Sequence, residues 1–525
     1  MTTAPDILTA AATERPDGVA VIVDPWGGAL ASTTTNAELE ALTNRFANGL
    51  LAHASPGERL VWCGPNSREV LVAIGAARKL QMVAVPLSYR FSAEEMVYVI
   101  DNSDATCVII DAEYAPMLAD AAASCPKVKT WVAYTATEGA PPIPEGFTAW
   151  EDVIAGQSDQ PPEVTSDLTP GAAMIYTSGT TGKPKGAMRT ATDPALTIAL
   201  LNELNYLHPD GVHLTTGPLY HSGPLAFASV AMQLAHPVVI MRRFDAATWV
   251  RLVGEHRVTN TFTAPTQLKR IVSLPDDVLA QADLSSMVTL IANAAPVPYA
   301  LKQELIAKLG DGWLYEVYGS TELGVDCVLR PEDQLRKPGS CGKPYGSIQI
   351  RIVGEDGATR PTGEAGELFV RSTMVMDGYH RTSEELAHAD DDGGDWHSVG
   401  DIAYVDEEGY VHICDRKKDM IISGGMNIYP AEVEAVLYAF PAVLDAAVFG
   451  VPDDEWGESV HAVVQAKPDH ELDLDALRAH VDEHLGGYKR PRTYEVRDEL
   501  PRTDSGKLLK RVLRDEHWKD RQQRV

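Results

Sequence analysis

Helical and strand patterns alternate through the first 115 residues of this chain, and this alternation limits the folds open to it. A capping-box spacing of Thr35 and Glu38 precedes apolar residues at helical intervals over 39–50, and the apolar run RLVW follows at 59–62. Four later segments repeat the order: a helical pattern at 70–77, the run MVAVPL at 82–87, a helix capped by Ser92 and Glu95, and the run TCVIID at 106–111. Such alternation predicts a sheet with parallel strands that is covered by helices.

The length of the chain, 525 residues, predicts more than one domain, because a single hydrophobic core stops growing well below that size. Helical and strand patterns alternate again after residues 415–418 for roughly 100 residues, the usual size of a small domain. Residues 137–170, rich in proline, glycine and acidic side chains, are interpreted as a surface connection. We therefore expect an α/β protein, with a large N-terminal domain of mixed sheets and packed helices at 1–416 and a small α+β C-terminal domain at 417–525.

The charge and the cysteines argue against several classes of protein. A formal net charge of −29 repels polyanions, so we expect neither nucleic acid nor an anionic membrane surface as a partner. The six cysteines lack a CxxC pair and indicate a reducing compartment: Cys63, Cys107, Cys125, Cys327, Cys341 and Cys414. The N-terminus has no signal-peptide pattern, and no run of about 18 apolar residues predicts a membrane span. We expect a cytoplasmic protein without integral membrane contact.

The segment YTSGTTGKPKGA at 176–187 has the composition of a phosphate-binding loop. Its glycines let backbone N–H groups approach oxygen atoms closely, while its hydroxyls and lysines add donors and positive charge. A Walker loop needs four residues between its glycines, whereas Gly179 and Gly182 enclose only two, and Pro184 removes an amide donor. A kinase or GTPase is therefore disfavoured. Taken alone, the segment is also compatible with a flexible surface hairpin.

Four further motifs follow this loop in order: YGSTELG at 318–324, SVGDIAYVDEEGY at 398–410, DRKKDMIISGGMNIYP at 415–430 and PRTDSGKLLKR at 501–511. With these motifs at these separations, the chain resembles the adenylate-forming superfamily of acyl-CoA synthetases, peptide-synthetase adenylation domains and luciferases, and in particular its acyl-CoA ligase branch. The resemblance runs from about residue 30 to 515, which is most of the chain. Long motifs that occur together in one order do not arise by chance.

The resemblance implies a two-step reaction that uses ATP, Mg²⁺ and CoA. Members of the superfamily join a carboxylic acid to the α-phosphate of ATP, which releases pyrophosphate, and a thiol then displaces AMP. Adenylation is needed because a carboxylate is already anionic and therefore a poor electrophile. The implied partners are small molecules, namely the acid, ATP and CoA, and a homodimer is left open.

The resemblance also implies which residues bind ATP. The loop would hold the β- and γ-phosphates, Tyr318 would lie against the adenine, and Thr321 would donate to the α-phosphate. Glu322, helped by Thr181, would ligate Mg²⁺, a hard cation that prefers oxygen. The implied ATP-binding residues are Thr177, Ser178, Gly179, Thr180, Thr181, Gly182, Lys185, Ala294, Ala295, Pro296, Tyr318, Gly319, Ser320, Thr321, Asp401, Arg416 and Lys507.

Two parts of this set concern the nucleoside. Asp401 would accept hydrogen bonds from both ribose hydroxyls, which suit one carboxylate, and Arg416 would add a donor. On the other side of the adenine, ANAAP at 292–296 departs from the commoner Ser-Gly-Gly-Ala-Pro. It keeps Ala-Pro but adds bulk, so the expected contacts of Ala294, Ala295 and Pro296 are less secure.

The catalytic residues that the resemblance implies are Lys507, His221, Glu322 and Thr321. Lys507 would be the lysine of adenylation, because a cation between carboxylate and phosphate stabilises the crowded transition state, and Lys510 is the nearest alternative. Lys507 lies in the small domain, whereas nearly all nucleotide contacts lie in the large one. Family members rotate a mobile small domain between the half-reactions, and the matching hinge position is Lys418.

Gly424 and Gly425 are implied to line a tunnel for the pantetheine arm of CoA, where a side chain would block passage. A plain β-turn is the alternative for this glycine pair. CoA is favoured as acceptor because no carrier domain is fused and SGGMN fits the ligases. Transfer to a carrier protein and a nucleotide-binding pseudoenzyme are the competing hypotheses. A phosphotransferase would produce ADP instead of AMP.

The acyl pocket is expected to follow His221, which would lie near the carboxylate and thiol route, although a single histidine is commonly structural. Small and apolar residues predominate there, without a cation placed for a second carboxylate, so we expect an apolar acid. The segment 273–306 favours a bulky polycyclic, terpenoid or steroid-like acid over a fatty acid, with an aryl acid as an alternative. The implied pocket residues are His221, Ser222, Gly223, Phe227, Thr266, Asn293, Gly319 and Leu323.

Overall fold

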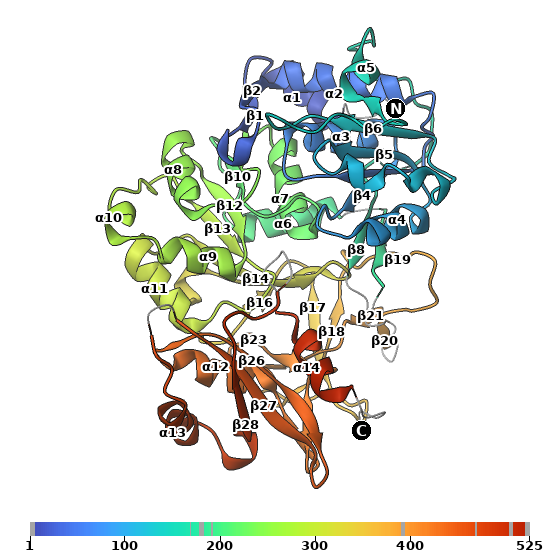
Figure 1. Ribbon diagram of the computed structural model, residues 1–525. Coiled ribbons are helices and arrows are strands. Elements are labelled where there is room, and N and C mark those ends of the chain that lie inside the picture. The colour runs from blue at the N-terminus through green and yellow to red at the C-terminus, as the bar shows by residue number, and fades with distance from the viewer. Residues whose placement is uncertain are drawn as a thin grey trace.

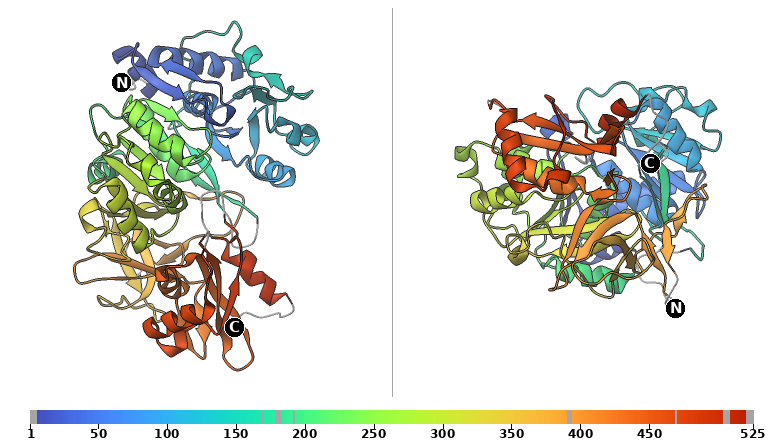
Figure 2. Two further views of the ribbon diagram at one scale, coloured as in Figure 1. Left: turned by 60° about the vertical axis from the view of Figure 1, so that its left-hand side comes forward. Right: turned by 90° about the horizontal axis from the view of Figure 1, so that it is seen from below.

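The computed structural model describes residues 6–168, 170–177, 183–190, 193–389, 394–467, 470–502 and 508–519, the side chain of Ala122 excepted. Within these ranges the strands form four sheets, of nine, eight, six and five strands. Figure 1 shows the chain running from the blue N-terminal helices and sheet, through the green and yellow central sheet, to an orange and red lobe that carries the last helices. The left view of Figure 2 shows the same succession from another side.

The eight-stranded sheet holds the alternating segments near the N-terminus and confirms the parallel sheet that they predict. Its order is β19-β9-β8-β4-β3-β5-β6-β7, and neighbours from β8 to β7 run parallel. Its strands are β3 (Arg59–Cys63), β4 (Val83–Leu87), β5 (Ala105–Asp111), β6 (Thr130–Tyr134), β7 (Thr148–Ala149), β8 (Ala173–Thr177), β9 (Lys185–Arg189) and β19 (Gly378–Tyr379). Every residue of β5 is buried, as expected for a parallel strand covered on both faces.

The helices of this region begin where the sequence predicts. Both capping boxes are present, at Thr35 with Glu38 and at Ser92 with Glu95. Each box satisfies N–H groups that the first helical turn would otherwise leave unpaired. The helices before residue 160 are α1 (Ile7–Glu14), α2 (Asn36–Leu50), α3 (Arg68–Lys79), α4 (Ala93–Asn102) and α5 (Trp150–Ile154).

The segment 137–170 is more than the surface connection that its composition suggests. It includes β7 and α5, and Trp150 in α5 is buried with its ring stacked 3.8 Å from that of Phe46. One large aromatic side chain, which buries much apolar area, fixes this part of the segment to the core.

The nine-stranded sheet supplies most of the candidate site. Its order is β16-β15-β14-β13-β12-β10-β11-β1-β2, and the pairs from β1 through β11, β10, β12 and β13 to β14 are parallel. Its strands are β1 (Val19–Val23), β2 (Ser32–Thr35), β10 (His213–Thr215), β11 (Val238–Ile240), β12 (Asn260–Thr263), β13 (Thr289–Ala292), β14 (Leu314–Ser320), β15 (Gly324–Leu329) and β16 (Lys343–Pro344). Loops at the carboxyl ends of parallel strands are where ligands bind in such sheets.

Helices α8, α9 and α11 pack against this sheet through one apolar core. They lie along the left edge of Figure 1. The helices of this region are α6 (Pro194–Glu203), α7 (Ser222–Gln233), α8 (Ala246–His256), α9 (Pro265–Val272), α10 (Asp276–Leu279) and α11 (Tyr299–Leu309).

The last two sheets follow in sequence. The six-stranded sheet comprises β17 (Gln349–Val353), β18 (Gly366–Arg371), β20 (Ala387–Ala389), β21 (Trp396–Ser398), β22 (Asp401–Val405) and β23 (Val411–Arg416). The five-stranded sheet comprises β24 (Ile421–Ser423), β25 (Met426–Ile428), β26 (Val443–Asp453), β27 (Gly457–Ala466) and β28 (Thr493–Val496). Its helices are α12 (Pro430–Ala439), α13 (Leu474–His484) and α14 (Lys510–Trp518), which agree with the patterns predicted after residue 418. None of the described helices is both long and apolar enough to cross a membrane.

Candidate active site

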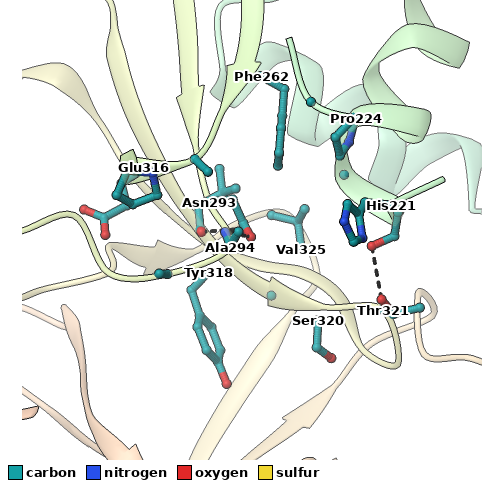
Figure 3. A pocket seen from close by; sticks show the side chains of 18 of the residues that line it. His221, Pro224, Phe262, Asn293, Ala294, Glu316, Tyr318, Ser320, Thr321 and Val325 are labelled. Atoms are coloured by element: carbon teal, nitrogen blue, oxygen red, sulfur yellow. Dashed lines mark hydrogen bonds between the residues drawn. The ribbon is translucent and has the colours of Figure 1, made fainter. Parts of the chain in front are cut away.

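A cavity of about 2660 Å³ opens between the nine-stranded sheet and the residues that follow β23. A pocket for a single small ligand measures roughly 300–1,000 Å³, so this cavity has room for more than one substrate. Its wall combines the turn after β13, strand β14, the start of α7 and parts of the C-terminal lobe, which comprises the described residues from 417 to 519. Figure 3 shows its inner part, where side chains from these separate elements converge.

At one end of the cavity, Tyr318 and Asp401 form a buried pair. The Tyr318 hydroxyl donates to Asp401 Oδ2 over 2.6 Å, and Arg416 Nε lies 3.4 Å from Asp401 Oδ1. Asp401 begins β22 and Arg416 ends β23, and the antiparallel register places the two residues opposite each other. Burial, followed by the charge of Asp401, raises the pKa of Tyr318 well above its usual value. The phenol therefore stays a neutral donor, and its ring lines the cavity.

A second polar cluster surrounds Glu322 at the turn between β14 and β15. Glu322 Oε1 accepts from Thr177 Oγ1 over 3.1 Å and from the Tyr379 hydroxyl over 3.0 Å. Burial and the Glu322 carboxylate raise the pKa of Tyr379. Lys185 pairs with Glu384 and lies 5.5 Å from the centre of the Tyr379 ring. Strands β8 and β19 and the β14–β15 turn thus surround the Glu322 carboxylate with hydroxyl groups, next to the end of β8 at Thr177.

Thr321 links this turn to the start of α7. Its hydroxyl lies 3.1 Å from Ser222 Oγ, an interaction drawn as a dashed line in Figure 3. His221 occupies the N-cap position of α7, with its ring 4.5 Å from that of Tyr220. Ser320 Oγ accepts from the N–H of Leu323, which closes the turn.

The inner end of the cavity is apolar and shaped by Phe262. A Cβ atom at Gly223 would lie 2.8 Å from the Cε2 atom of that ring, closer than real Cβ contacts come, so only glycine lets the ring approach α7 this closely. Behind it, the Phe227 ring stacks at 5.7 Å from Phe262. Figure 3 shows Phe262 pointing between His221 on one side and Asn293 on the other. Thr266 and Gly319 also line the wall.

The structure does not place Leu323 at this wall. Leu323 is fully buried among the apolar side chains that join the nine-stranded sheet to the six-stranded one, and the cavity is lined by its neighbours Glu322 and Gly324 instead. The tight turn after Ser320 is the physical reason, because it directs the Leu323 side chain into that core. The sequence of a motif does not indicate which of its side chains point into the cavity and which into the core.

The turn after β13 departs from what its sequence suggests. Ala294 adopts φ +76°, a left-handed conformation that glycine favours, so the alanine carries a backbone cost. The Asn293 side chain supports it: Oδ1 accepts from the Ala294 N–H, and Nδ2 donates to the Val317 carbonyl over 2.7 Å. Ala294, Ala295 and Pro296 all line the cavity.

The C-terminal lobe contributes Lys418 and Lys510 to the cavity wall. Lys510 Nζ lies 2.8 Å from Glu434 Oε1, so the alternative to Lys507 is held in an ion pair. Arg502, the second residue of the PRTDSGK stretch, donates from Nε to Asp445 Oδ2 over 3.0 Å. Six predicted site residues lie outside the described residues: Ser178, Gly179, Thr180, Thr181, Gly182 and Lys507.

Gly424 and Gly425 form the tip of the β24–β25 hairpin, with φ of +57° and +78°. A Cβ at Gly424 would lie 2.9 Å from Cζ3 of Trp456, whereas one at Gly425 would meet nothing within 4 Å. Neither residue is among those that line the cavity in this arrangement of the molecule.

Sequence reasoning missed three groups next to the site. Tyr379 binds Glu322, and Arg189 donates to the Thr321 carbonyl over 3.0 Å. Asp326 is fully buried behind Tyr318, and neither of its carboxyl oxygens has a hydrogen-bond partner among the described residues. Burial and the charge of Asp401 raise the pKa of Asp326 well above its usual value. An acidic residue inside the otherwise apolar strand pattern of β15 was the one available signal.

Comparisons with known proteins place this geometry in a family. Residues 8–380 match the model of the AMP-binding enzyme family, and residues 432–507 match that of the AMP-binding enzyme C-terminal domain. A feruloyl-CoA synthase of Amycolatopsis sp. is 37% identical over 487 residues, which cover 91% of this chain and 93% of that protein. A long-chain-fatty-acid–CoA ligase of Mycobacterium tuberculosis is 32% identical over 489 residues, 92% of this chain and 93% of its own length.

Two solved structures extend the likeness to the fold. ATP-bound MatB from Rhodopseudomonas palustris aligns with a TM-score of 0.83 at 29% identity, over 98% of this chain and 99% of that one. The o-succinylbenzoate CoA synthetase of Bacillus subtilis, in complex with its acyl-adenylate, aligns with a TM-score of 0.82 at 28% identity, over 98% and 99%.

The chain therefore belongs to the AMP-binding enzyme family, the adenylate-forming superfamily, and within it to the acyl-CoA ligase branch. It is an acyl-CoA synthetase with the α/β fold expected from its sequence, and ATP and CoA are the co-substrates that fit this family. The resemblance predicted from the motifs is confirmed.

Proposed function

We propose that this enzyme activates an apolar, ring-bearing carboxylic acid with ATP and transfers the acyl group to CoA. The acid's carboxylate would attack the α-phosphorus of ATP, and the bond to the bridging oxygen would break to release pyrophosphate. The thiol of CoA would then attack the acyl carbon and release AMP. The observation that supports this most is a single cavity that joins the Asp401 and Glu322 clusters to an apolar end at Phe262.

The polar clusters suit the two ends of ATP. Asp401, held by Tyr318 and Arg416, would accept from the ribose hydroxyls, and the cavity wall at Ala294, Ala295 and Pro296 would face the adenine. Thr177, next to Glu322, marks where the phosphates would enter the loop. Tyr318 would contribute its ring to the nucleoside side as well as its hydroxyl to Asp401.

The residues present fit a magnesium ion. Glu322 offers a carboxylate among hydroxyl oxygens, which is the hard donor set that Mg²⁺ prefers, and Thr181 is the second candidate ligand. When bound, the ion would neutralise charge on the phosphates. Thr177 and Tyr379 would orient the Glu322 carboxylate through their hydrogen bonds.

The apolar end suits a ring. The Phe262 ring, in close contact with Gly223, forms one wall, Val325 lines the cavity as well, and Asn293 has both ends of its amide engaged with the backbone. A wall of this kind favours a planar or fused-ring group over a flexible chain, because a rigid ligand loses less entropy when it binds. Feruloyl, indoleacetate and 2-succinylbenzoate ligases are among the relatives, and a hydroindenyl-propanoyl ligase is another.

Lys507 remains the proposed lysine of adenylation, with His221 near the acid carboxylate. We keep the boundary between the two domains at 416–417 and the hinge at Lys418, which lies at the cavity wall between the lobes. Neither Gly424 nor Gly425 lines the cavity in the present arrangement. Rotation about the hinge would therefore be needed to bring the two glycines to the thiol route.

A carrier protein is the second candidate acceptor. It is supported by a fatty acid–acyl-carrier-protein ligase of Streptomyces coeruleorubidus, which is 32% identical over 503 residues. The reaction would consume CoA in one case and the thiol of a carrier protein in the other, so an assay of CoA consumption separates the two acceptors.

The first prediction concerns the overall reaction. With ATP, Mg²⁺ and a panel of aryl, fused-ring and fatty acids, we expect pyrophosphate release that depends on CoA and yields AMP, with ring-bearing acids turned over fastest. Lys507→Ala should lower the rate of adenylation by about 10²–10³-fold, the typical effect of losing one charged contact to the transition state. Lys510→Ala, which removes the alternative lysine, should affect stability more than the rate constant.

Other outcomes would overturn parts of the proposal. ADP as product would contradict adenylation, and pyrophosphate release with CoA untouched would favour a carrier protein. Fatty acids preferred over all ring acids would contradict the proposed substrate class.

The second prediction concerns the acyl pocket. Gly223→Ala should push the Phe262 ring into the cavity and lower kcat/KM for ring acids about tenfold relative to a short straight-chain acid, the scale of one methyl group in a pocket. Phe262→Leu should shift the preference in the opposite direction, towards wider acids. The measurement is the ratio of kcat/KM between two acids, which cancels differences in the amount of folded enzyme. If the ratio of kcat/KM between the two acids is unchanged in both variants, the acid does not bind against Phe262 and Gly223.

A further inference from the structure

Three side chains that can bind a metal converge on the sheet of the C-terminal lobe, outside the active site. His461 comes from β27, Glu495 from β28 and His517 from α14. One ligand atom of each lies within 4.8 Å of the others. The parallel register of β27 and β28 sets His461 opposite Thr493, and it sets Glu495 two residues farther along on the same face.

His461 presents an unsatisfied nitrogen to this cluster. The residue is only 5% exposed, and its Nδ1 lies 2.7 Å from Thr493 Oγ1. Its Nε2 is buried and has no hydrogen-bond partner among the described residues. The nearest acidic atom, Glu495 Oε2, is 3.7 Å away. When Nδ1–H donates to Thr493, a buried lone pair on Nε2 faces a carboxylate oxygen, an arrangement that a cation between the two atoms would stabilise.

The neighbours of the cluster fix its members in place. Arg497 donates to Glu495 Oε1 and also to Glu516 on α14, over 2.6 Å, which leaves Glu495 Oε2 directed at His461. The Phe449 ring lies 5.2 Å from that of His461 and 5.7 Å from that of His517, so both imidazoles rest on one aromatic surface. Supporting partners of this kind orient the ligands in protein metal sites.

We propose that His461, Glu495 and His517 form a binding site for a divalent transition-metal ion, with Zn²⁺ as the best match. Two imidazoles and one carboxylate are a donor set that suits zinc and does not suit Mg²⁺ or Ca²⁺. Bond lengths near 2.1 Å place tetrahedral ligand atoms about 3.4 Å apart, so ligand atoms that are up to 4.8 Å apart must approach by as much as about 1.4 Å. His517 is exposed and can rotate to do so, and water would complete the coordination.

The bound ion would tie α14 to the sheet beneath it. Helix α14 begins at Lys510, three residues after the end of the PRTDSGK stretch. A ligand that binds only the folded lobe stabilises it by RT ln(1 + [L]/Kd), so the effect grows with the concentration of free metal ion. The site therefore couples metal binding to the stability of the segment that follows Lys507, without any part in the reaction itself.

The test uses full-length protein without a histidine tag, freed of metal with a chelator and kept in excess Mg²⁺. Zn²⁺ is titrated against a chromophoric zinc chelator. We expect one equivalent bound with a dissociation constant of micromolar or below. His517→Ala and Glu495→Gln, both at accessible positions, should each raise that constant at least tenfold. Zn²⁺ should raise the melting temperature of the wild type but not of His517→Ala, and Co²⁺ should give the intense visible bands of a tetrahedral site.

Two control variants address other places where zinc could bind. His480 and His484 are neighbours on α13, with ring centres 4.4 Å apart, and Cys414 is the one cysteine that is not buried. His484→Ala and Cys414→Ser should leave the tight equivalent intact. The proposal is overturned if no zinc binds, if either control removes the tight equivalent, or if His517→Ala and Glu495→Gln both retain it. None of these results depends on which acid the enzyme activates.

Discussion

Replacing Glu322 with glutamine should lower the rate of acyl-adenylate formation by about 10²–10³-fold, the typical loss when one contact to the charged transition state is removed. The amide has the same shape and can still accept from Thr177 and Tyr379, so the turn between β14 and β15 should keep its conformation. What disappears is the negative charge that we propose as a magnesium ligand. The measurement is pyrophosphate release at saturating ATP and acid, over a range of Mg²⁺ concentrations.

Glu384→Gln is the matched control for that experiment. Its carboxylate lies nearby and pairs with Lys185, but its side chain is 43% exposed and it makes no hydrogen bond to the Glu322 cluster in the described part of the chain. We expect a change in rate of a few-fold at most. Equal losses of rate in Glu322→Gln and Glu384→Gln would mean that the rate responds to the total negative charge of the region. That result would contradict a specific role for Glu322.

The second large effect concerns the ion pair of Lys302 and Glu316 beneath the turn after β13. The side chains are 2% and 8% exposed, so both charges are removed from water. Lys302→Met should destabilise the protein by about 3–5 kcal/mol, because it leaves a buried carboxylate without its partner. Glu316 Oε1 also accepts from the Val297 N–H over 3.0 Å, so loss of Lys302 should raise the KM for ATP as well. Urea unfolding and initial rates measure the two effects.

Two further variants give this prediction its controls. Replacing both partners, as Lys302→Met with Glu316→Leu, should restore most of the stability, since a buried pair can be exchanged for apolar side chains at little cost. Lys269 and Glu304 form a similar pair 2.7 Å apart on the neighbouring helices α9 and α11, but they are 35% and 32% exposed. Lys269→Met should cost less than about 1 kcal/mol. If it destabilises the protein as much as Lys302→Met, burial is not the cause.

Local signals predicted the parts of this molecule that depend on neighbours in sequence. The capping boxes at Thr35 and Ser92 and the buried strand β5 follow from spacing and composition, because a helix start or a covered strand is set within a few residues. Motif order indicated the family, which the comparisons confirm. The two motifs containing Tyr318 and Asp401 also meet in space, with a hydrogen bond across 83 positions of sequence.

The remaining features depend on contacts between distant segments. Tyr379 reaches Glu322 only because β19 pairs with β9, and no local pattern predicts that pairing. Leu323 was expected at the pocket wall, but the direction of its side chain is set by the turn that Ser320 closes. The positive φ of Ala294 does not follow from the residue itself, since alanine gives no hint of a left-handed conformation.

The ion pairs of Arg502 and Lys510, which flank Lys507 in the sequence, limit how far that lysine can move relative to the lobe. Arg502 is held by Asp445 and Lys510 by Glu434, all within the C-terminal lobe. A chain spans at most about 3.6 Å per residue, so the Cα of Lys507 can lie no farther than roughly 11 Å from that of Lys510. The link between Lys507 and helix α14 is therefore short. A short link would give the lysine ammonium a high effective concentration at the site against which the lobe is docked and a very low one at any other site. Rotation of the lobe as a rigid body would then move the positive charge of Lys507 into the active site or out of it.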